Sequence, residues 1–177
     1  QGYIACDKCG LDIQTTDLPK KVETTEADTE SLMVKAKTYN YHGHVLEAYG
    51  TILKQLDAVF QPHHIHVYRV VKKAFKVAQK AGEEGQALVY GERCLVALRA
   101  HMDGCDGLLG HNLLRVGRLQ AKLGLEREAH RTLTEALPTL RVAFGADNAL
   151  TVQAQGLMDQ LSTRKEGAGI LADIGHA

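Results

Sequence analysis

The sequence lacks the features of membrane-spanning and disulfide-stabilised proteins. No apolar run approaches the ~20 residues that a membrane-spanning helix needs, and no signal peptide is recognisable. The four cysteines have no regular spacing, which favours a reducing compartment, cytoplasmic or nuclear, over a disulfide scaffold. Because the chain opens at Gln1 rather than Met, we expect it to be a piece of a longer protein.

Residue patterns that indicate catalysis are also missing. We find no Ser/His/Asp set around a nucleophile elbow, no glycine-rich phosphate loop and no pair of acids with a plausible cleft. The sequence therefore predicts a binding or supporting domain that is not catalytic by itself.

Charge of one sign is lacking overall but not locally. The 21 basic and 21 acidic residues cancel, yet residues 61–145 hold 13 basic and 8 acidic residues between two acidic flanks. Aromatic residues make up only 5% of the chain, and few of them interleave with the basic ones. We therefore regard nucleic acid as an unlikely partner.

The sequence is rich in amphipathic helical segments. Between residues 108 and 145, apolar residues recur at three- and four-residue steps on both sides of Gly124, as in two antiparallel helices. In the first of these, either Leu119 or Gln120 continues the apolar stripe. Pro138 is expected to bend or tighten the last turns of the second helix.

The turn of this hairpin recurs along the chain. Gly-x4-Ala occurs at 43–48, 82–87 and 124–129, at intervals of 39 and 42 residues. A helical hairpin cannot bury its apolar face alone, so recurring hairpins predict an all-α, tetratricopeptide-like right-handed array. An irregular helical bundle is the alternative. The expected helices cover residues 25–41, 44–60, 65–80, 84–102, 108–123, 126–145 and 148–161.

We divide the chain into three segments. Residues 1–22 form a cysteine-containing segment and linker, residues 23–163 the helical domain, and residues 164–177 a flexible tail. Cys6 and Cys9 form a CxxCG knuckle, which we interpret as half of a zinc site with its other ligands upstream. A loose surface turn and a redox pair are the alternatives.

The remaining cysteines and a histidine run have simpler interpretations. Cys94 lies within an apolar stripe, which predicts core packing, and Cys105 lies in a glycine-rich loop as an exposed thiol. His63, His64 and His66 resemble a metal ligand set, but beside a proline turn they more often form a solvated helix start.

One face of two successive helices is basic. Counting back from Gly82 and Gly124 by the same offsets selects ten positions, and eight of them are Lys or Arg. In a tetratricopeptide array this face lines the inner groove, where it would bind an acidic peptide. The alternative is an ordinary solvated face. The eight candidate partner-binding residues are Arg69, Lys72, Lys73, Lys76, Lys80, Arg115, Arg118 and Lys122.

Two stretches resemble the C-terminal part of the SET- and MYND-domain protein-lysine methyltransferases. They are residues 65–95 and 116–148, and the matching motifs are Val67-Tyr68, 87–91, 117–120 and 145–147. Asn148 stands where that family commonly has His. The resemblance implies that Cys6 and Cys9 belong to a cysteine-rich post-SET zinc region preceding a tetratricopeptide-like domain.

The resemblance implies a supporting role in such an enzyme. The SET domain, which binds S-adenosylmethionine, and the MYND module are absent from the sequence. The helical domain would shape substrate access and bind proteins, such as acidic chaperone tails and histone or non-histone substrates. The alternative is a protein-interaction module like the kinesin light chain repeats, which residues 144–151 also resemble. A small zinc-dependent structural protein is a third interpretation.

Overall fold

The computed structural model describes the backbone of residues 18–36 and 42–174, and the side chains of residues 23–25, 27–34 and 42–164. Within these ranges all secondary structure is helical, as predicted. The helices are α1 (Leu18–Ala36), α2 (His42–Asp57), α3 (Ile65–Ala81), α4 (Glu84–His101), α5 (Gly107–Lys122), α6 (Glu126–Phe144) and α7 (Ala149–Ile174).

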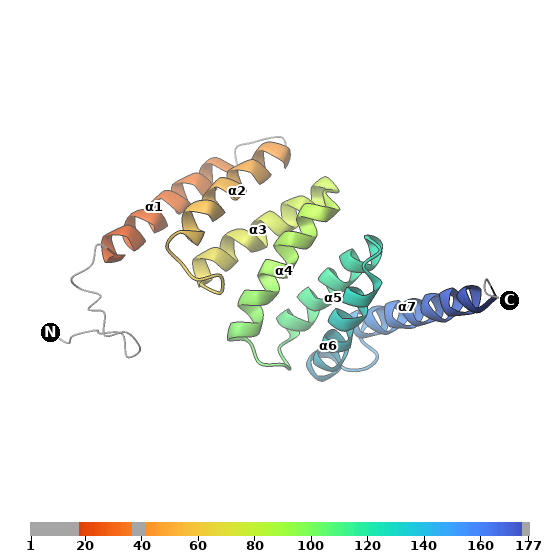
Figure 1. Cartoon of the computed structure of the whole chain (residues 1–177). Helices are drawn as coiled ribbons and strands as arrows, with labels where there is room; N and C mark the ends of the chain where they lie inside the picture. The colour runs from red at the N-terminus through yellow and green to blue at the C-terminus, as the bar shows by residue number, and fades with distance from the viewer. Residues whose placement is uncertain (1–17, 37–41, 175–177) are drawn as a thin grey trace.

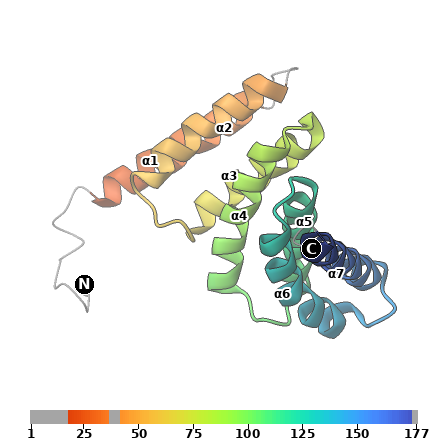
Figure 2. The same ribbon diagram turned by 45° about the vertical axis from the view of Figure 1, so that its right-hand side comes forward.

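The helices pair into antiparallel hairpins that stack in chain order. Figures 1 and 2 show α1 beside α2, α3 beside α4 and α5 beside α6, each pair next to the previous one. Helix α7 packs on α5 and α6, in the position of the first helix of a fourth hairpin. The predicted all-α stack of helical hairpins is therefore confirmed.

The turns inside the second and third hairpins are the same. Gly82 and Gly124 have φ of 76° and 77°, in the left-handed region that only glycine adopts without strain. After each glycine, the next amide donates to a carbonyl five residues earlier: Glu83 N to Ala78 O at 3.0 Å, and Leu125 N to Gln120 O at 2.8 Å. This is the Schellman ending of a helix. Two turns of one geometry, 42 residues apart, show that the repeat is structural.

Close helix crossings occur at glycines. A Cβ on Gly91 of α4 would lie 2.8 Å from Val116 Cγ2 in α5 and 3.1 Å from Phe75 Cζ in α3. A Cβ on Gly117 would lie 2.9 Å from Leu133 in α6. Phe75, Val116 and Leu133 are fully buried. The glycines therefore let neighbouring helices approach closely enough to form one continuous core.

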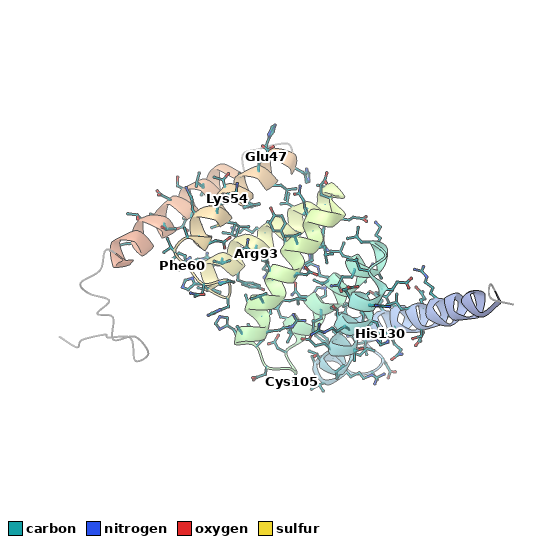
Figure 3. The ribbon with its side chains drawn as sticks, viewed as in Figure 1. Glu47, Lys54, Phe60, Arg93, Cys105 and His130 are labelled. Carbon is teal, nitrogen blue, oxygen red and sulfur yellow. The ribbon has the colours of Figure 1, made fainter. Side chains whose placement is uncertain are left out.

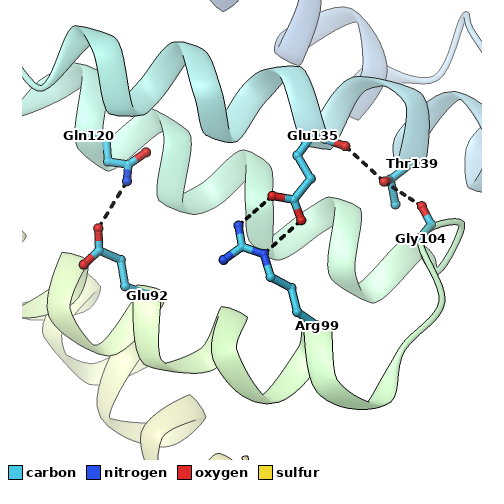
Figure 4. A network of polar contacts seen from close by, with 6 residues as sticks. All are labelled: Glu92, Arg99, Gly104, Gln120, Glu135 and Thr139. Atoms are coloured by element: carbon cyan, nitrogen blue, oxygen red, sulfur yellow. Dashed lines mark hydrogen bonds and ion pairs between the residues drawn. The ribbon is translucent and has the colours of Figure 1, made fainter.

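Polar contacts also join successive hairpins (Figure 4). Arg99 of α4 makes a two-pronged ion pair with Glu135 of α6, at 2.9 and 2.6 Å. The Gln120 side chain donates to Glu92 at 3.2 Å, and the Thr139 hydroxyl donates to the Gly104 carbonyl at 2.7 Å. Partly exposed pairs of this kind contribute little stability but fix how the helices are aligned.

Several predicted boundaries are wrong. Helix α1 begins at Leu18 rather than near residue 25, because Pro19 in a first helical turn has no amide to leave unpaired. Gly43 is not a turn glycine but lies in the first turn of α2. The α7 backbone continues to Ile174, beyond the expected end at 161. Gln120, not Leu119, is the buried member of its pair.

Helix α6 runs through Pro138 to Phe144. None of the helices described is both long and apolar enough to cross a membrane.

Candidate functional site

Helices α3, α5 and α7 form one face of the stack, and hollows lie along it. We call this the α3–α5–α7 face. A hollow of about 360 Å³ lies between α3 and α5, lined by Gln79 and by residues of α5. Two more, of about 220 and 380 Å³, lie between α5 and α7. Arg118 lines all three, so its side chain marks the centre of the face.

The side chains that line these hollows are basic, amide-bearing or aliphatic, and none is acidic. Arg115, Arg118, Lys122 and Arg164 supply positive charge. The remaining lining residues are Gln79, His111, Leu119, Ala121, Gln153, Gly156, Leu157, Gln160 and Leu161. Such a lining attracts carboxylates and offers amide groups that can pair with a peptide backbone.

Arg115 joins α5 to α3. Its guanidinium lies 4.2 Å from the centre of the Phe75 ring and donates to the side chains of Gln79 and Asn112. Burial lowers the pKa of Arg115 from its usual value, and burial likewise lowers the pKa of neighbouring His111. Of the eight predicted binding residues, Arg115 is therefore the one most engaged in holding the fold together.

Three other predicted residues reach toward other helices. The Lys73 ammonium is 3.5 Å from the Met33 sulfur in α1. Lys80 lines a separate hollow of about 630 Å³ between α2, α3 and α4. The ammonium of Lys122 forms an ion pair with Glu84 at the start of α4.

The other four predicted residues present their charge to solvent. Arg69, Lys72, Lys76 and Arg118 are exposed, and the Lys72 ammonium lies 5.8 Å from the centre of the Tyr68 ring. Of these four, only Arg118 lines a hollow. The structure thus divides the predicted basic face into an open row on α3 and a hollowed region around α5.

Sequence reasoning missed the contribution of α7. Gln153, Gln160 and Arg164 complete the hollows beside α5. The repeat interval contained the signal, because 42 residues after Arg118 and Lys122 stand Gln160 and Arg164. We had treated the last helix as a cover for the stack and did not extend the count to it.

The cysteines and histidines show no metal site in the described part of the chain. Cys6 and Cys9 lie outside it. Cys94 is fully buried in the core, and burial raises its pKa to about 12. Cys105 is exposed in the loop between α4 and α5 (Figure 3).

The histidine run begins a helix, as expected. His64 caps α3 by accepting from the His66 amide, and its ring stacks on Phe60 at 4.2 Å between centres. No group of three or more His, Cys, Asp or Glu in the described residues is placed to hold a metal ion.

Similarity to known proteins is visible in the fold rather than in the sequence. Comparison with protein-family models and with curated proteins finds no match. Among solved structures, the chain is similar to a protein from Podosopora anserina described as a kinesin light chain with nearly identical TPR-like repeats, with a TM-score of 0.54 and 9% identity. That alignment covers 81% of this chain and 66% of that one.

A point variant of the same repeat protein is also similar. It aligns with a TM-score of 0.56 and 10% identity, over 89% of this chain and 86% of that chain. The fold is that of tetratricopeptide-like repeats. At this identity the similarity concerns the fold alone.

Proposed function

We propose that this chain is a protein-interaction module that binds an acidic, extended segment of a partner protein across the α3–α5–α7 face. The observation that carries the proposal is the lining of its three hollows, which includes four cationic side chains and no acid. Tetratricopeptide-like folds supply such surfaces by stacking hairpins, so the fold and the charge favour the same use.

A matched pair of variants tests this proposal. The probe is a fluorescein-labelled peptide of Glu and Gly residues with one central Leu, measured by fluorescence anisotropy. Reversing Lys76 and Arg118 to Glu is expected to weaken binding at least tenfold, about 1.4 kcal/mol. Reversing Arg127 and Arg131 to Glu changes the net charge equally, but these exposed α6 residues line none of the three hollows.

Equal affinity in the two variants would contradict the proposal, because binding would then depend on net charge and not on this face. Salt should also weaken binding of the probe to the native chain, since exposed charges are screened.

Of the two protein contexts considered from the sequence, the structural neighbours favour a repeat module of the kinesin light chain type. The methyltransferase context has support only from residues 65–95 and 116–148 and from the cysteine knuckle. We propose it as the second candidate, with cytoplasmic or nuclear localisation. Coding sequence upstream of Gln1 tests it. A SET-type Asn-His and Gly-x-Gly pattern there would favour the methyltransferase, and further 42-residue repeats the interaction module.

Zinc binding by Cys6 and Cys9 remains part of that second candidate. Two thiolates alone bind zinc weakly, so the isolated chain should carry well under one equivalent after gel filtration. The Cys6→Ser/Cys9→Ser variant is the control and should carry still less. A tight stoichiometric site in the native chain would show that further ligands lie within this sequence.

A further inference from the structure

The hollows between α5 and α7 combine positive charge with an aliphatic floor. The smaller one is lined by Ala121, Leu157 and Leu161 together with the cations Arg118, Lys122 and Arg164. Its volume of about 220 Å³ exceeds the ~150 Å³ of an apolar protein cavity that accommodates benzene. An aliphatic side chain therefore fits where carboxylates are also attracted.

Charge at this end of the face is partly compensated but not cancelled. Glu84 pairs with Lys122, and Glu126 lies 3.8 Å from Arg164. Arg118 is exposed and lies where the three hollows meet. A carboxylate beside Arg118 would therefore meet a guanidinium that is able to grip it through two hydrogen bonds.

We propose that the α5–α7 region is a two-part anchor site for an acidic segment of a partner protein. An aliphatic side chain of the segment enters the hollow over Leu157 and Leu161, and a neighbouring carboxylate pairs with Arg118. This inference rests on the proposed function and narrows it: the partner segment carries an aliphatic residue within an acidic run, rather than acidic residues alone.

Gly156 offers a way to block the site without disturbing the fold. It lines the larger α5–α7 hollow, and a Cβ built on it meets no heavy atom within 4 Å. Because glycine is a poor helix former, any replacement that fits should keep or improve the stability of α7. Gly156→Leu places a bulky side chain at the hollow, and Gly156→Ala is the matched control.

The test compares two labelled peptides on these variants by fluorescence anisotropy. The first is the Glu/Gly peptide with the central Leu, and the second has Gly in place of that Leu. The native chain and Gly156→Ala should prefer the Leu peptide about tenfold. Gly156→Leu and Arg118→Glu should each lose most of that preference, with circular dichroism and melting temperature showing that both remain folded.

The outcomes separate this inference from the function on which it rests. If both peptides bind equally and only the Lys76→Glu/Arg118→Glu reversal weakens them, the acidic-segment function stands and the two-part anchor is wrong. If neither peptide binds, both are wrong.

A second copy of the chain is the competing occupant, because α1 exposes Glu23, Asp28 and Glu30. Sedimentation coefficients that rise with concentration in the native chain, but not in Arg118→Glu, would assign the site to a second copy and overturn the proposal.

Discussion

At the scale of single residues, glycine at helix crossings sets the spacing of the stack. Gly91→Ala should destabilise the fold by about 1–2 kcal/mol, because overpacking costs about 1–3 kcal/mol and better helix propensity offsets about 1 kcal/mol of it. The added methyl group would meet Val116 and Phe75, which are fully buried. Chemical denaturation measures the change.

Gly85→Ala is the control for this substitution. Gly85 lies in the same helix, and a Cβ there meets nothing within 4 Å. Its replacement should be neutral or stabilising by up to about 1 kcal/mol. Equal effects at the two positions would contradict the close crossing at Gly91.

Cysteine reactivity is a second property of single residues. In a Cys6→Ser/Cys9→Ser background, Ellman's reagent at pH 8 should modify Cys105 quickly and Cys94 only after denaturation. With its pKa raised by burial to about 12, Cys94 is a thiolate in about one molecule in ten thousand at that pH. Rapid modification of two thiols in the folded protein would show that the core around Cys94 opens readily.

At the scale of secondary-structure elements, two turns define the repeat. Gly82→Ala should destabilise the fold by about 1–2 kcal/mol, because a residue with a Cβ is strained at positive φ. Gly50→Ala, within α2 and with no atom within 4 Å of the new Cβ, should not. Thermal unfolding compares them. Equal melting temperatures would mean that the Gly82 turn does not need its left-handed geometry.

The helices and their pairing could be predicted from sequence because apolar spacing and turn glycines are local signals. Boundaries were less predictable. Gly43 shares the Gly-x4-Ala spacing of Gly82 and Gly124, but it lies in the first turn of α2, and spacing alone does not reveal the sign of φ. The choice between Leu119 and Gln120 depended on which residue meets α4, a tertiary contact.

At the scale of the whole molecule, the candidate site was only half predictable. Periodicity identified the basic residues of α3 and α5 as one face. It did not show that Arg115 binds across to Phe75 and Gln79, or that Lys122 meets Glu84, because these partners lie 36 to 40 residues away in sequence. The contribution of α7 followed from the same interval but needed the count to be carried one repeat further.

The central claim is that partner segments bind the face formed by α3, α5 and α7. Backbone chemical-shift mapping of the ¹⁵N-labelled chain, titrated with the Leu-containing acidic peptide, tests it most directly. The largest shifts are expected at residues of α5 and α7 around Arg118, with smaller ones along α3. Shifts confined to α2, α4 and α6, or no saturable shifts at all, would contradict the claim.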